Sequence, residues 1–223
     1  MIPLRRQALL IAAADLRAER RIGEVVWVAI PFGIVALLVI PMAIGIDTAL
    51  LARLGSGLFW VVVLLFGLGV TQRQTASGSS AHDDTLRLLG VDPAARFVGN
   101  SLASASLLLG FATLVGLATV ILYDPPLPSW WLLATVVALA VAGLAMVGTI
   151  TGAVARGIGS RTTLAPLLAA PLAIPILLGA TQAMEGMRQG AGILRWMLLL
   201  ALVDTLVAVA GVLTARPLEE AAG

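Results

Sequence analysis

The chain has 223 residues, of which 60% are hydrophobic and only 12% are charged, with a formal net charge of +2 and a mean hydropathy of +1.03. A soluble domain of this length cannot bury so much apolar surface, so the composition excludes a soluble globular protein and indicates that lipid is its main solvent. The absence of cysteine excludes disulfides, thiolate metal sites and thioether-linked cofactors, and the absence of lysine excludes the phosphate-binding loop Gly-x-x-x-x-Gly-Lys-Ser/Thr.

Six stretches are long and apolar enough to cross a membrane as helices. About 20 residues, each rising about 1.5 Å, are needed to span roughly 30 Å of hydrocarbon. The first stretch begins after more than twenty mixed residues and is too long for a signal peptide, so we expect no cleaved signal. The predicted fold is therefore an all-α integral membrane protein with a single membrane domain over residues 1–223. The predicted spans are residues 25–46, 55–72, 102–123, 129–155, 162–183 and 193–214.

Residues 3–22 predict a helix with one apolar and one basic side. At about 100° per residue, Leu4, Ala8 and Ile11 fall on one side, whereas Arg6 and Arg17 fall on the other. This pattern is typical of an interfacial elbow helix that frames the cytoplasmic face of a transporter. It is equally typical of a simple basic anchor, and both interpretations stay open.

The distribution of arginine predicts the orientation. With six spans, eleven of the fourteen arginines fall in the N-terminal segment, the second and fourth loops and the C-terminal tail, all on one side. Only Arg53, Arg188 and Arg195 fall on the other side. Because cytoplasmic segments carry the excess of basic residues, we expect a multi-pass protein with both termini in the cytoplasm.

Prolines interrupt two of the predicted spans. Pro31 and Pro41 lie in the first span, and Pro166, Pro171 and Pro175 lie in the fifth. Each removes a backbone donor and tends to kink its helix. Such kinks could line a path or allow rocking, although prolines are also ordinary structural residues in transmembrane helices.

Residues 73–92 form a long polar loop between two apolar runs. An aspartate at its centre can cap a short helix over Thr85–Leu89, and Asp92 can cap a second helix that begins with Pro93 and continues into the third span. The leucines of the short helix need either a protein groove or the membrane surface. The loop is therefore either a coupling helix that seats in a nucleotide-binding subunit or an amphipathic turn on lipid. The candidate coupling residues are Asp83, Asp84, Thr85, Leu86, Arg87, Leu88 and Leu89.

Asp204 lies near the middle of the last predicted span. A carboxylate is costly at that depth, so we expect a functional or paired residue that faces the interior of the bundle. The carboxyl group could be protonated, or it could bond to a hydroxyl such as that of Thr205 or one on another helix.

Three residues at the outer end of the fifth span, Met184, Glu185 and Arg188, are candidates for an outer-face contact. Methionine can ligate haem iron, but in an apolar helix it is more often a packing residue. We find no catalytic constellation and no metal-ligand spacing, so we predict a non-catalytic chain without a metal site of its own. If ATP drives this protein, another chain must hydrolyse it.

Three segments share the patterns of a known family. Residues 50–61 read Leu-Leu-Ala-Arg-Leu-Gly-Ser-Gly-Leu-Phe-Trp-Val, which resembles the second-span entry of the CcmB family, the membrane subunit of the cytochrome c maturation ABC system. Gln72-Arg73, followed by the leucine pattern of residues 83–89, resembles the Glu-Arg … Asp-Gly-x-Leu-Glu-x-Leu loop of that family. Residues 168–184 read Leu-Ala-Ala-Pro-Leu-Ala-Ile-Pro-Ile-Leu-Leu-Gly-Ala-Thr-Gln-Ala-Met, which resembles its fifth-span Leu-Pro-Leu-x-Ile-Pro stretch. Gln72, Asp84 and Arg87 depart from the family pattern.

The resemblance implies an ABC-2-type permease of the type V exporter kind in the bacterial inner membrane. Two copies would pair with two copies of a CcmA-type ATPase, alongside a CcmC-type haem-handling protein, a CcmD-type small helper and the haem chaperone CcmE. ATP would bind the partner subunit, and haem would be handled by the complex. The implied function is to couple ATP hydrolysis to release of haem-loaded chaperone, or to haem export, on the outer face, with no role for nucleic acid.

Two other functions remain open. The chain could be an ABC-2 permease for a lipid, glycan or drug. It could also be a secondary carrier that uses Asp204 for proton coupling. A neighbouring ATPase would argue against the carrier.

Overall fold

The computed structural model describes residues 3–23, 25–45, 47–77, 90–125, 129–157 and 164–221. These residues form helices joined by short connections, and none of them lies in a strand. In chain order the helices are α1 (Leu4–Ile22), the π-helix η1 (Val25–Ala29), α2 (Ile30–Ile44), α3 (Thr48–Ser77), α5 (Pro93–Tyr123), α6 (Trp130–Gly157), α7 (Leu164–Arg188) and α8 (Leu194–Ala221).

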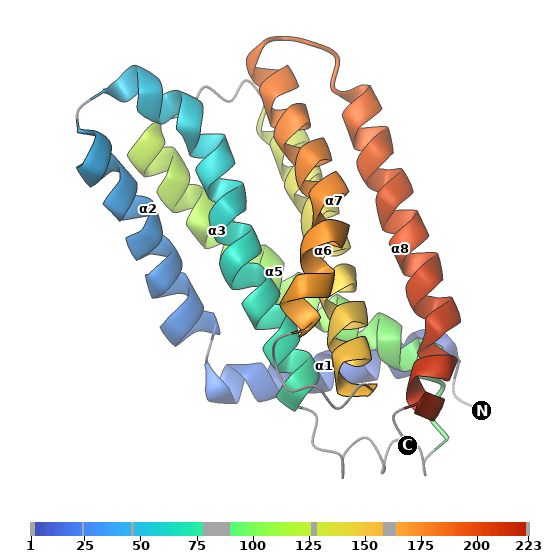
Figure 1. Cartoon of the computed structure of the whole chain (residues 1–223). Helices are drawn as coiled ribbons and strands as arrows, with labels where there is room; N and C mark the ends of the chain where they lie inside the picture. Colours follow the sequence, from blue (N-terminus) through green and yellow to red (C-terminus); the bar gives the residue numbers. More distant parts are fainter. Residues whose placement is uncertain are drawn as a thin grey trace.

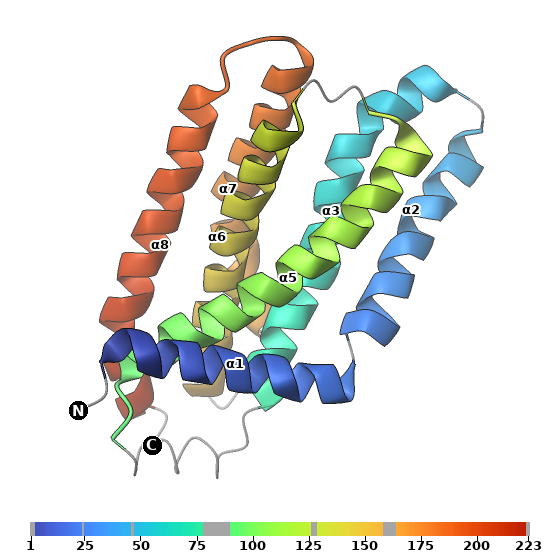
Figure 2. The same cartoon turned by 180° about the vertical axis from the view of Figure 1, so that it is seen from behind.

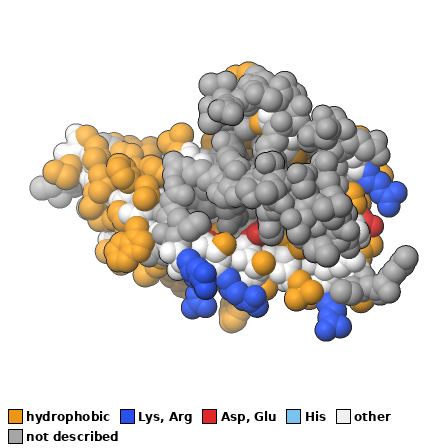
Figure 3. All heavy atoms as spheres, turned by 90° about the horizontal axis from the view of Figure 1, so that it is seen from below, with side chains coloured by type: hydrophobic (Ala, Val, Ile, Leu, Met, Phe, Trp, Pro, Cys, Tyr) orange, Lys and Arg blue, Asp and Glu red, His pale blue; other side chains and the backbone are white. Residues whose placement is uncertain are grey.

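Helices α2 to α8 run side by side as a bundle, and α1 lies across one end of it (Figures 1 and 2). We call the end crossed by α1 the lower end and the opposite end the upper end. Both ends of the chain are marked at the lower end, and the side of the membrane that this end faces stays a prediction. Figure 3 looks at the lower end and shows basic side chains projecting from its edge.

Five of the six predicted spans form helices long and apolar enough to cross a membrane, which makes the chain a multi-pass membrane protein. The first predicted span forms a shorter apolar helix over Trp27–Ala43, so the count of six crossings stays a prediction. Pro31 lies within this shorter helix, at the start of α2 and directly after the π-helix η1. The five long apolar segments are Thr48–Gly67, Pro93–Tyr123, Trp130–Ala155, Leu167–Arg188 and Leu194–Pro217.

Helix α6 is the central element of the bundle. It packs against α3, α5, α7 and α8. Half of its most apolar stretch is buried inside the structure, compared with 17% of the corresponding stretch of α8. The side chains at its interfaces form a continuous core that includes Phe111, Leu144 and Ile176. Substitutions in α6 therefore disturb several helix contacts at once.

Helix α1 packs on the lower part of α5, and Ala8 and Ile11 of the predicted apolar side lie at this contact. Ala8 and Ala12 are buried, whereas Leu4, also on the predicted apolar side, is 49% exposed. Gly99 of α5 lets the α1 backbone approach closely: a Cβ atom there would lie 2.8 Å from the Cβ of Ile11 and 2.9 Å from the carbonyl oxygen of Ala8. The helix expected over residues 3–22 is thus held by α5, and its contact with the membrane surface stays a prediction.

Substituting Gly99 with alanine is expected to loosen α1 from the bundle. The new methyl group would collide with the carbonyl oxygen of Ala8 and the Cβ of Ile11, neither of which can rotate away, at a cost of about 1–3 kcal/mol. Hydrogen exchange of the α1 amides in detergent should then be faster than in the unmodified chain. Gly110→Ala on the same helix is the matched control, because nothing lies within 4 Å of its added Cβ. Equal protection of α1 in both variants would contradict this packing.

Candidate functional site

The predicted coupling residues Asp83 to Leu89 lie outside the described residues, so their helix stays a prediction. The two long helices that border them are described, and they are α3, which ends at Ser77, and α5, which begins at Pro93. The site is therefore built from the lower end of the bundle, where α5 packs against α1 and α8.

Asp92 joins three helices at this lower end. Its Oδ1 atom accepts a hydrogen bond of 2.9 Å from the main-chain N–H of Ala94, which confirms that Asp92 caps the helix beginning at Pro93. Its own N–H donates to Oε1 of Gln7 in α1 at 3.3 Å, and its Oδ2 lies 3.9 Å from Nη2 of Arg216 in α8. Asp92 thus contacts α1, α5 and α8 at one point of the lower end.

Asp204 faces the interior of the bundle, where α8 packs against α6. The residue is only 9% exposed, and its Oδ1 atom has no hydrogen-bond partner among the described residues. Thr205 does not serve as the partner, because its hydroxyl donates to the carbonyl of Ala201 at 2.7 Å.

Gly143 of α6 provides the space for the Asp204 carboxyl group. A Cβ atom at position 143 would lie 2.3 Å from Oδ1 of Asp204 and 2.9 Å from Cδ1 of Ile176. The carboxyl group of α8 thus lies against α6 where α6 has no side chain, with α7 close by. Hydropathy could locate Asp204, but nothing in the sequence indicated that Gly143 was its counterpart.

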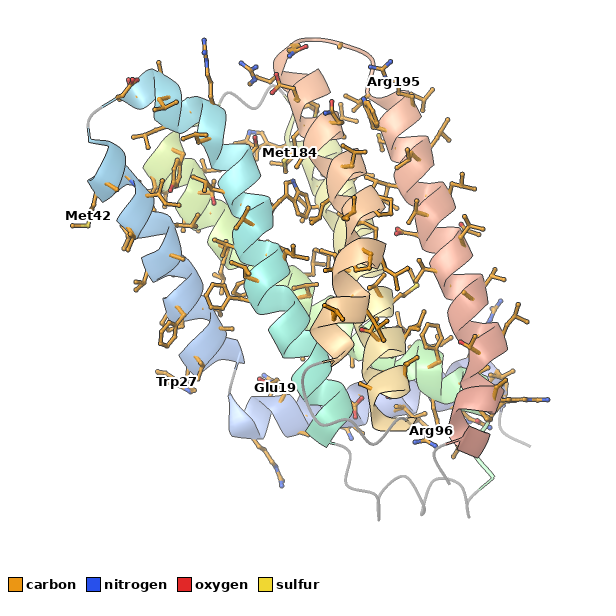
Figure 4. The ribbon with its side chains drawn as sticks, viewed as in Figure 1. Glu19, Trp27, Met42, Arg96, Met184 and Arg195 are labelled. Carbon is orange, nitrogen blue, oxygen red and sulfur yellow. The ribbon has the colours of Figure 1, made fainter. Side chains whose placement is uncertain are left out.

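At the upper end, Met184 is a packing residue in this chain. Its side chain is 6% exposed, and its sulfur accepts a hydrogen bond of 3.2 Å from the indole Nε1 of Trp60, which is buried in α3. Figure 4 shows Met184 in this upper region of the bundle. Because a buried indole N–H needs an acceptor, Met184 ties α7 to α3.

Glu185 and Arg188, in contrast, remain accessible. The Nε atom of Arg188 donates to Oε2 of Glu185 at 2.8 Å, and about a third or more of each side chain is exposed. Arg195 stacks on the ring of Trp196, with 5.0 Å between the guanidinium carbon and the ring centroid, at the same end of the molecule (Figure 4). Of the three residues predicted for an outer contact, these two are the ones a partner could reach. Among the described residues, no three His, Asp or Glu side chains gather as a metal site would require.

One tertiary contact was not predicted at all. Tyr123, at the upper end of α5, donates a hydrogen bond of 2.7 Å to the main-chain carbonyl of Leu37 in α2. The sequence does indicate that the Leu37 carbonyl lacks its usual helical donor, because that donor would be the N–H of residue 41, which is a proline. The identity of the replacement donor could not be read from the sequence.

Comparison with known proteins gives two matches. The family model described as CcmB protein matches residues 6–220. The chain is also 28% identical over 188 residues to heme exporter protein B of Rhodobacter capsulatus. The aligned region covers 81% of this chain and 82% of that protein.

Proposed function

Because this chain belongs to the CcmB family, we propose that it is the membrane subunit of an ABC complex for cytochrome c maturation. In this proposal a CcmA-type partner hydrolyses ATP, and the chain transmits the resulting movement to the outer face, where haem-loaded chaperone is released or haem is exported. The observation that supports it most is the family match across residues 6–220, together with the similarity to a protein named heme exporter protein B.

The geometry at the lower end suggests how the movement is received. The proposed coupling helix at Thr85–Leu89 lies between the end of α3 and the start of α5, so a nucleotide-binding subunit that holds its leucines would act directly on α5. Asp92 would pass this displacement to α1 through Gln7 and to α8 through Arg216. Helix α1 would then tilt with α5, since Gly99 brings their backbones into contact.

We further propose the partners that the family implies. These are the CcmA-type ATPase, a CcmC-type haem-handling protein, a CcmD-type helper and the CcmE chaperone, with two copies of this chain in each complex. The accessible pair Glu185 and Arg188 is the proposed contact with the outer partner. The proposed location is the bacterial inner membrane, with α1, both termini and the coupling loop on the cytoplasmic side.

Removal of this chain is expected to abolish cytochrome c maturation in the cell that makes it. Without the membrane subunit the ATPase has nothing to act on, so holocytochromes should fall to the level of a strain that lacks the whole complex. Covalent haem stain of membrane and soluble proteins, with the chain restored from a plasmid as control, measures this directly. Normal holocytochrome levels after deletion would rule out the proposal.

Asp204 provides the one specific observation in favour of a different function, a proton-coupled carrier. A buried carboxyl group without a described partner is unusual inside a membrane, and such groups often mark proton pathways. The same cytochrome assay with Asp204→Asn discriminates between the two functions. If cytochrome c maturation is undiminished in Asp204→Asn, Asp204 is a packing residue against Gly143. If maturation is completely lost although the variant folds stably, a role of Asp204 in proton transfer is favoured.

A further inference from the structure

The upper half of α2 contains a break in its backbone hydrogen bonding. In an α-helix the carbonyl of residue i accepts from the N–H of residue i+4, and Pro41 has no N–H to offer Leu37. An unsatisfied carbonyl is costly inside a membrane, where water cannot take the place of the missing donor. Some other group must therefore satisfy the carbonyl of Leu37.

The donor is the hydroxyl group of Tyr123, which is the one tyrosine of the chain. Its Oη atom lies 2.7 Å from the carbonyl oxygen of Leu37, and both residues are buried, at 2% and 0% exposure. Gly55 of α3 leaves room for the tyrosine, since a Cβ atom there would lie 2.9 Å from the Cβ of Tyr123. Tyr123 is thus held by its neighbours in the position that α2 requires.

Tyr123 is also the last residue of α5, the helix that begins next to the predicted coupling loop. Helix α5 has 31 residues and no proline after its first position, so it forms one continuous rod of roughly 46 Å. Its first residues are tied to α1 and α8 through Asp92, and its last residue holds α2. A movement at one end of α5 is therefore carried to the bond between Tyr123 and Leu37 at the other.

We propose that this bond is a latch that fixes the upper part of α2 against α5, and that it opens when α5 moves. The part of the proposal that concerns opening rests on the proposed function, because ATP hydrolysis by a partner would supply the movement. Two features allow the part of α2 after Leu37 to change its direction relative to the rest of the helix. Pro41 removes the backbone bond that would hold the helix straight, and Gly45, with φ of +81°, ends it four residues later.

The latch can be tested by the distance between spin labels, since the chain has no cysteine of its own. Met42→Cys lies just beyond Pro41 at the upper end of α2 (Figure 4), and Trp131→Cys lies on α6, which packs against α5. Both positions are highly exposed, at 83% and 86%. Tyr123→Phe keeps the ring and removes the hydroxyl, and it should increase the population with a longer label distance by roughly threefold to tenfold.

Pro41→Ala is the matched rescue. Alanine restores the N–H that Leu37 lacks, so Tyr123→Phe should have little effect on the label distance when combined with Pro41→Ala. A Tyr123→Phe distribution identical to that of the unmodified chain would overturn the latch, as would an equal effect of Tyr123→Phe with and without Pro41→Ala. These measurements need the purified chain alone and do not depend on a partner.

A second comparison tests opening in the assembled complex. Adding a non-hydrolysable ATP analogue to the complex with the ATPase subunit should lengthen the label distance in the unmodified chain. An unchanged distance in a complex that binds the analogue would overturn the role of the latch in the cycle. Failure of the ATPase to bind the chain at all would count against the proposed function instead, and the effect of Tyr123→Phe on the isolated chain would still decide whether the latch exists.

Discussion

Replacing Gly143 with alanine is expected to destabilise the folded chain by about 2–3 kcal/mol. The added methyl group would lie 2.3 Å from Oδ1 of Asp204 and 2.9 Å from Cδ1 of Ile176, which is closer than such atoms can come without movement of a helix. Because α6 packs against four other helices, movement away from α8 disturbs contacts on its other sides. Equilibrium unfolding in mixed micelles, followed by circular dichroism, measures the decrease in the free energy of unfolding.

The collision should be relieved by a second substitution. Asp204→Ala removes the carboxyl group that occupies the space, so the double variant should regain most of the stability lost in Gly143→Ala. Asp204→Ala alone should cost little, because it removes a buried carboxyl group whose Oδ1 has no described hydrogen-bond partner. Gly57→Ala on α3 is the control for the glycine change itself, since nothing lies within 4 Å of its added Cβ. Additive losses in the double variant would contradict the contact between Gly143 and Asp204.

Local signals in the sequence predicted individual helices well. The cap at Asp92 and the start at Pro93 depend on neighbouring residues, and both were predicted at the right position. Hydropathy located the long apolar helices for the same reason, although α3 begins at Thr48, well before the predicted start at residue 55. The apolar segment of α3 itself begins at Thr48, so the predicted start at residue 55 was too late, because Arg53 interrupts the apolar run there.

Contacts between helices were not predictable in the same way. The apolar side of residues 3–22 was predicted, but nothing in the sequence indicated that its Ala8 and Ile11 would pack against Gly99 of α5. Tyr123, which donates the hydrogen bond to Leu37, lies 86 residues away from it in sequence. The residue that makes room for Asp204 is Gly143, which has no side chain that could indicate this contact. Such pairings depend on the geometry of the whole bundle, which neither periodicity nor spacing encodes for a single chain.

The largest functional effect is expected from the leucines of the predicted coupling helix. Burying a leucine side chain in a protein groove contributes about 1.5–3 kcal/mol, and an aspartate in its place would bring an unpaired charge into that groove. Leu86→Asp combined with Leu89→Asp should therefore weaken binding of the ATPase subunit by at least about a hundredfold. Both positions lie in the predicted polar loop between two predicted spans, so we expect the bundle itself to fold and insert normally.

Co-purification of the CcmA-type ATPase with the tagged chain, together with the ATPase activity of the isolated complex, tests this most directly. The control is Ser79→Asp with Ser80→Asp, which adds the same two charges to the same loop but leaves the leucines in place. We expect the serine variant to retain the ATPase subunit at the level of the unmodified chain, and the leucine variant to lose it while still inserting into the membrane. Equal retention and equal ATPase activity in both variants would contradict the assignment of this loop as the point where ATP hydrolysis acts on the membrane subunit.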